Sequence, residues 1–304
     1  MFSACIGIDW SGARGPRQPG IQIARARDGR AAPETIRAAD GRHWGRETVR
    51  DWLLAEADAA WSPILVGIDF AFAHPFIDEG AYYPGLDDSP PAPDALWARV
   101  EAECAADPHL YGGAMFAAPR VGDYYLSPRN HGAPRYRSRR RLTEQAARAA
   151  ARAPSPTFKA IGADNVATGS MAGMRLIHAL RAALGPELAV WPFDETTQPD
   201  RLSMVLVEIF PSFYFHRAGF NPARNAAADP VFMTDALNAY DSRGVGPDFS
   251  PRGADADEAD AIISAAALRW FAARDEFWKV PPAAAKEGWI FGVPGSVGEK
   301  AYED

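Results

Sequence analysis

The chain has 304 residues, 47% of them hydrophobic, and only two cysteines. This is enough apolar material for a real core, whereas Cys5 and Cys104 are too few and too far apart for a disulfide framework or a zinc site. The formal net charge of -7 argues against a surface that binds nucleic acid all over, so such a partner requires a local basic patch. No hydrophobic run is long enough to cross a bilayer, and Asp9 interrupts the first apolar stretch. We therefore expect no membrane partner and a cytoplasmic location.

The first part of the sequence predicts an antiparallel meander, a helix and a buried strand. We expect strands over residues 5–8, 21–26, 34–38 and 64–68, and a helix over residues 47–60. The run 64–68 is apolar almost throughout, as expected for a strand that is covered on both faces. This order is typical of an α/β domain whose sheet begins antiparallel and turns parallel.

The composition changes between residues 75 and 155, where proline, glycine, aromatic residues and arginine accumulate. We interpret this segment as an insertion or elaborated loop region within a single domain over residues 1–304, because sustained apolar periodicity is scarce. The remaining spacing predicts helices over residues 94–105, 142–151, 165–184, 212–217, 229–240 and 257–271, short strands over 188–193 and 204–210, and a turn and late strand over 287–293.

The same segment contains a concentrated basic run, formed by Arg135, Tyr136, Arg137, Arg139, Arg140 and Arg141. One interpretation is the solvated face of the helix that follows. The other is a contact surface for DNA or RNA, in which arginine neutralises phosphate charge and the tyrosine stacks on a base. The sequence leaves both interpretations open.

Five acidic residues stand at the ends of apolar elements. They are Asp9, Asp69, Glu208, Asp257 and Asp260: the first two end strands, the third lies late in a strand, and the last two open an apolar helix. Each alone is compatible with an ordinary strand-ending or helix-capping acid. Carboxylates packed against an apolar sheet are costly without a cation, so together they predict a shared counter-ion.

Oxygen ligands without histidine or cysteine select Mg²⁺ or Mn²⁺. Two such ions would activate a water and stabilise the leaving oxygen during hydrolysis of a phosphodiester bond. We therefore predict Asp9, Asp69, Glu208 and Asp260 as metal ligands, and Asp257 as either a ligand or the residue that orients the water.

Five motifs carry a resemblance to a known family. Gly7-Ile8-Asp9-Trp10-Ser11, Gly67-Ile68-Asp69-Phe70, Glu208-Ile209-Phe210-Pro211, Asp257-x-x-Asp260-Ala261 and Glu287-Gly288-Trp289-Ile290 resemble the predicted ribonuclease-H-like nucleases of domain-of-unknown-function family 429. The resemblance implies a mixed five-stranded sheet that begins with an antiparallel meander and is flanked by helices. The Asp-x-x-Asp motif is also similar to that of the Holliday-junction resolvases, whose metal site uses an acid on the first strand and acids on the last helix.

The leading hypothesis is thus a metal-dependent nuclease, a hydrolase of DNA or RNA. One alternative is an ATPase or phosphotransferase of the related actin-like fold, whose first strand also ends in aspartate. Gly12, Gly15 and Gly20 are spread among arginine and proline, which is unlike a loop that cradles nucleotide phosphates. The other alternative is a catalytically inactive nucleic-acid-binding protein that uses only the basic run.

Overall fold

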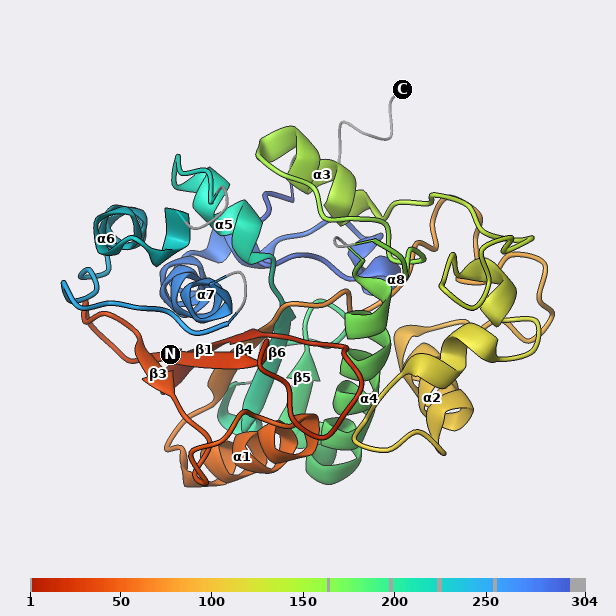
Figure 1. Cartoon of the computed structure of the whole chain (residues 1–304), viewed down its shortest axis with the longest axis horizontal. Coiled ribbons are helices and arrows are strands. Elements are labelled where there is room, and N and C mark those ends of the chain that lie inside the picture. The colour runs from red at the N-terminus through yellow and green to blue at the C-terminus, as the bar shows by residue number, and fades with distance from the viewer. Residues whose placement is uncertain (1, 163–164, 197–198, 223–225, 254–255, 296–304) are drawn as a thin grey trace.

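A mixed sheet forms the centre of the molecule (Figure 1). The computed structural model describes residues 2–162, 165–196, 199–222, 226–253 and 256–295. The strands are β1 (Ala4–Asp9), β2 (Gln22–Ala26), β3 (Glu34–Ile36), β4 (Ile64–Ile68), β5 (Leu188–Val190) and β6 (Met204–Glu208). Their order across the six-stranded sheet is β3-β2-β1-β4-β6-β5. The first three strands pair antiparallel, whereas β1, β4, β6 and β5 are parallel, so their carboxyl ends share one edge.

Helices cover both faces of this sheet. They are α1 (Arg46–Ala59), α2 (Pro93–Cys104), α3 (Leu142–Ala150), α4 (Ala167–Leu184), α5 (Pro211–Arg217), α6 (Pro230–Asn238), α7 (Asp257–Ala272) and α8 (Ala284–Glu287). Figure 1 shows α5, α6 and α7 on one side of the sheet and α1 on the other. The buried side chains of α1, α2 and α4 belong to one apolar cluster, and those of α5, α6 and α7 belong to a second.

Side-chain alternation along the strands separates the two clusters. In β1, Ile6 and Ile8 belong to the α1 and α4 cluster, whereas Cys5 belongs to the α7 cluster. Gly7 lets α7 approach closely, since a Cβ there would lie 2.6 Å from the carbonyl oxygen of Ala261. The missing side chain therefore fixes the distance between α7 and the central strand.

Residues 75–155 pack onto the sheet and share its core. Tyr82, Trp97 and Tyr125 are fully buried in the same cluster as Ile8 and Val66. Besides α2 and α3, the segment contains the short 3-10 helices 113–117 and 122–124. It therefore contributes part of the core, although little of it is regular secondary structure.

The element order agrees with the sequence prediction, with two differences. The sheet has six strands where the family resemblance implied five, because the short β5 extends it beyond β6. The late strand expected over residues 287–293 is not formed, because the chain turns there and only Ile290 bridges to Glu208. Positive φ angles at Gly288 and Gly292 maintain that turn. No helix in the described ranges is long and apolar enough to cross a membrane.

Candidate functional site

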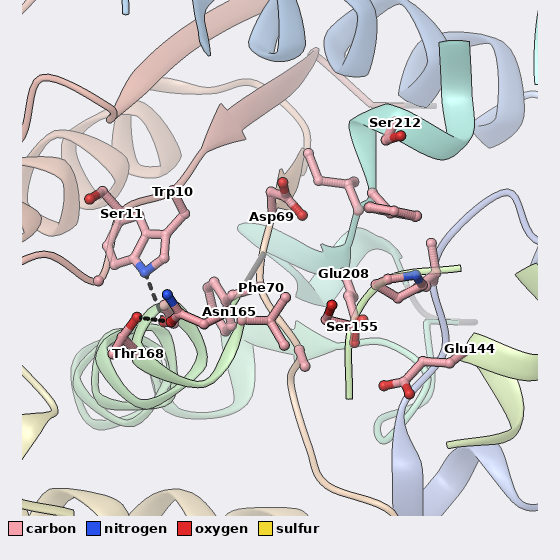
Figure 2. Close-up of a pocket in the computed structure, with 18 of the residues that line it drawn as sticks. Trp10, Ser11, Asp69, Phe70, Glu144, Ser155, Asn165, Thr168, Glu208 and Ser212 are labelled. Atoms are coloured by element: carbon pink, nitrogen blue, oxygen red, sulfur yellow. Dashed lines mark hydrogen bonds between the residues drawn. The ribbon is translucent and has the colours of Figure 1, made fainter. Parts of the chain in front are cut away.

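A cavity of about 780 Å³ lies at the shared carboxyl edge of β1, β4 and β6 (Figure 2). Its lining comes from the loop after β1, the loop after β4, the start of α4, the start of α5 and the approach to α3. In open α/β sheets, ligands bind at this edge because the loops diverge there and leave a crevice. The cavity is thus the natural place to look for the predicted site.

Asp69 enters this cavity directly from the end of β4. Figure 2 shows its side chain among Trp10, Ser212 and Glu208. Trp10 shapes the neighbouring wall, where its indole Nε1 donates to the carbonyl oxygen of Gly169 at 3.2 Å. Asp9 stands one residue earlier, at the end of β1, and by alternation faces the side of the sheet that α7 covers.

The start of α7 brings two further acids to the same edge. Glu258 anchors this helix to β3 and the residues after it, because its Oε1 accepts hydrogen bonds from Thr35 and Arg37, each at 2.7 Å. The carboxylate of Asp257 lies beside the loop after β1, since a Cβ on Gly20 would be 3.5 Å from its Oδ2. Asp260 lies one turn further along the helix.

Three other aspartates act on the buried carboxyl group of Asp9. Burial raises the pKa of Asp9 well above its usual value, and the charges of Asp260, Asp69 and Asp257 raise it further. Burial and the charge of Glu208 raise the pKa of Asp69 to about 7. The opposing effect at Asp9 is a backbone hydrogen bond from Trp10, which lowers its pKa. We call Asp9, Asp69, Asp257 and Asp260 the aspartate group.

Glu208, by contrast, is held by an arginine. Its Oε1 and Oε2 accept hydrogen bonds from Nη2 and Nη1 of Arg141 at 2.6 and 2.7 Å, and Oε2 also accepts from the backbone N–H of Phe72 at 3.1 Å. Arg141 Nε donates to Oε1 of Glu144 at 2.9 Å. All three charged side chains are buried, with relative exposures of 1% for Arg141 and 4% and 0% for the two glutamates. We call them the arginine triad.

The triad contains an unusual acid. Oε2 of Glu144 has no hydrogen-bond partner among the described residues and lies 4.0 Å from Nη1 of Arg140. Burial raises the pKa of Glu144 to about 7, against the opposing effect of Arg141. The pKa of Arg141 is raised, because the two glutamates outweigh the effect of its burial. The arginine therefore stays charged at every accessible pH.

The basic run does not form one surface. Arg139 is buried and pairs with Asp78 at 2.6 Å, while Arg137 is exposed and lies 3.3 Å from Glu79. Arg135 donates to the hydroxyl of Tyr124 at 2.9 Å, and Tyr136 packs against the core.

Of the six residues in the run, the cavity is lined only by Arg140 and Arg141, and the run precedes α3 instead of lying on it. Neither sequence interpretation, a helix face or a continuous phosphate surface, describes this arrangement. Most contacts of the run lie within the segment 75–155, and among the described residues only Arg141 bonds to partners outside it, Glu208 and Glu287.

Sequence reasoning assigned no site role to two arginines of the cavity or to its buried acid. Arg14 and Arg152 are exposed and line the cavity together with Arg140. They lie in unrelated loops, so no local pattern could link them. Glu144 could have been suspected, because it lies three residues after Arg141, a spacing at which helix-start side chains meet.

No protein-family model, curated protein or solved structure matches this chain. The resemblance described from the sequence therefore rests on its motifs alone. Within the described ranges, no three acidic, histidine or cysteine side chains already surround one point as metal ligands. What the site can do has to be inferred from its charges and its shape.

Proposed function

We propose that this protein is a Mg²⁺- or Mn²⁺-dependent nuclease with a ribonuclease-H-like fold. The observation that carries the proposal is the aspartate group: Asp9 is buried at the end of β1, and its pKa is raised by burial and by the carboxylates that follow β4 and begin α7. Mutual repulsion of this kind stores free energy that a divalent cation can release.

The fold supports this proposal through its connectivity. The sheet begins with an antiparallel meander, its first strand is central, and the long helix α7 packs back onto that strand. This agrees with the arrangement that the family resemblance implies, with β5 as an additional edge strand. A fold alone does not determine a reaction, so the site must supply the chemistry.

The aspartate group suits a hard cation. Its donors are carboxylate oxygens without histidine or cysteine, which favours Mg²⁺ or Mn²⁺ over zinc. Asp9, Asp69 and Asp260 would hold the ion, and Asp257 would orient a water. When bound, the ion supplies charge that activates this water and stabilises the phosphorane-like transition state. The water oxygen bonds to phosphorus, the bond from phosphorus to the leaving ester oxygen breaks, and a proton passes to that oxygen.

Arginines around the cavity suit a phosphate substrate. Arg14, Arg140 and Arg152 line it from three different segments and place positive charge outside the acidic group. Arg140 is positioned by a hydrogen bond to the carbonyl oxygen of Pro154 at 2.7 Å. A phosphodiester backbone can thus contact the arginines while one phosphate reaches the aspartates. In an acidic protein, this is the local basic patch that such a substrate requires.

The test is cleavage of single-stranded and structured DNA and RNA by the purified chain, with Mg²⁺ or Mn²⁺ and with EDTA. We expect metal-dependent cleavage that falls by more than about 100-fold in D9N and in D260N, since each removes a metal-binding charge. The variant R152S should weaken substrate binding and lower its salt slope by about one, whereas R137S, outside the cavity, should not. Absence of cleavage, or full activity in D9N and D260N, would contradict the proposal.

A further inference from the structure

The number of divalent ions that the carboxyl edge of the sheet can bind depends on which of its acids are already paired with a basic side chain. Six acidic side chains gather there: the four of the aspartate group and the two glutamates of the arginine triad. The triad has a resident cation in Arg141, whereas within the described ranges neither Asp9 nor Asp69 forms an ion pair with an arginine, lysine or histidine. The two groups are neighbours, since the charge of Glu208 in the arginine triad raises the pKa of Asp69 in the aspartate group.

Arg141 binds Glu208 in a way that a metal ion would have to reverse. The pair is bidentate, at 2.6 and 2.7 Å, and this geometry gives the strongest arginine–carboxylate interactions. The guanidinium is fixed by two more acceptors, Oε1 of Glu144 at 2.9 Å and the carbonyl oxygen of Glu287 at 3.1 Å. Four of its five N–H groups are therefore used inside the protein.

Displacement of Arg141 would be costly on both sides. The arginine would keep its charge in a buried position and lose its partners, and Glu144 would lose its only hydrogen-bonded cation among the described residues. A divalent ion at Glu208 would also compete with the backbone N–H of Phe72 for Oε2. Asp9 accepts a hydrogen bond from the backbone N–H of Trp10, but within the described ranges neither Asp9 nor Asp69 is tied to an arginine that an ion would have to displace.

We propose that Arg141 takes the place of a second divalent ion, so that the centre binds a single Mg²⁺ or Mn²⁺ through Asp9, Asp69 and Asp260 while Glu208 stays on Arg141. This inference rests on the proposed nuclease function for the identity of the ion. It changes the role of Glu208 from metal ligand to positioning residue. Arg141 then supplies fixed positive charge on the α3 side of the cavity, where its side chain forms part of the lining.

The test counts bound Mn²⁺ by electron paramagnetic resonance and measures its affinity by calorimetry, on the full chain without substrate. We expect about one tightly bound Mn²⁺ per chain. In D9N, the affinity for this ion should fall by more than tenfold. The variant E208Q keeps the shape of the side chain and should change the affinity by less than about threefold, because it removes only a neighbouring charge. The variant R139Q, which alters a buried arginine outside the cavity, should still bind one ion.

Two results would overturn the inference and leave the nuclease proposal standing: two tight ions in the wild-type chain, or loss of binding in E208Q as severe as in D9N. No Mn²⁺ binding together with no cleavage would overturn both. The variant R141Q adds a further arm, because it frees Glu208 and should raise the count toward two ions. If R141Q fails to fold, the comparison of E208Q with D9N still decides the matter.

Discussion

Buried negative charge is arranged differently on the two sides of the cavity, the α3 side and the α7 side. On the α3 side, Glu144 and Glu208 share Arg141, and all three are closed off from solvent. On the α7 side, the aspartates raise the pKa of Asp9 at the end of the central strand. One side is neutralised by its own arginine, whereas the other is the side that we propose to bind a cation. This difference distinguishes a structural ion pair from a candidate catalytic centre.

Local structure explains why the acids of one side are paired with an arginine and those of the other side lie close to one another. The arginine triad is built from a loop, α3 and β6, with charged groups at hydrogen-bonding distance. The aspartate group is built around a glycine contact, because Gly7 lets α7 come close enough for its first turn to reach the end of β1. Close backbone packing thus concentrates charge that the fold would otherwise keep apart.

The largest change in stability is expected from removing Arg141, the cation of the arginine triad. The variant R141M should lower the free energy of unfolding by about 3–5 kcal/mol, because it leaves two buried carboxylates without their partner. Urea denaturation measures this loss. Adding E208Q to R141M should restore at least about 1 kcal/mol, since one of the orphaned charges disappears. A loss below about 1 kcal/mol in R141M would mean that the triad is not the fixed ion pair described above.

A smaller change in stability, of opposite sign, is expected from removing a carboxylate of the aspartate group. In EDTA at pH 8, D9N should raise the free energy of unfolding by about 1–2 kcal/mol, because burial and the neighbouring carboxylates disfavour the ionised form of Asp9 in the folded protein and asparagine has no such cost. We also expect Mn²⁺ to raise the thermal stability of the wild-type chain and D9N to lose this effect. The control D235N changes an exposed aspartate of α6 and should alter neither quantity. Destabilisation by D9N in EDTA would show that Asp9 is already compensated.

These expectations also indicate what the sequence could reveal. The positions of Asp9 and Asp69 follow from apolar runs that end in an acid, and parallel strands bring such ends to one edge. The helix of Asp257 and Asp260 is evident from its spacing. What brings these elements together, a glycine contact between α7 and β1, depends on tertiary packing that the motif alone does not specify.

The pairing of Glu208 illustrates the limit of pattern reasoning. From the sequence it is one more strand-ending acid, equivalent to Asp69. Its partner Arg141 lies 67 residues away, in a segment with scarce apolar periodicity, so no spacing rule connects the two. The basic run likewise appears continuous in the sequence, whereas burial of Arg139 and Arg141 divides it. Charge patterns locate charged residues, but only packing decides which of them face a cavity.

The smallest effect concerns the pH dependence of stability near the arginine triad. His74 is buried and hydrogen-bonds Thr157 at 2.9 Å and Tyr125 at 2.7 Å. Burial, together with the positive charges of Arg141 and Arg139, lowers its pKa well below the usual value of 6.5. The folded protein therefore keeps His74 neutral in the range where the unfolded chain begins to bind a proton.

The sign of this effect follows from proton linkage. Below pH 6.5 the unfolded chain binds a proton at His74 that the folded chain does not, so this residue lowers stability as the pH falls. Its share is at most about 1.4 kcal/mol per pH unit. The variant H74Q should therefore lose less stability than the wild type in urea titrations between pH 7 and 5.5. The exposed-site control H43Q should keep the wild-type slope. Comparing slopes cancels the opposite contribution of carboxyl groups such as Glu144, whose raised pKa favours the folded state as the pH falls. An unchanged slope in H74Q would mean that folding does not lower the pKa of His74.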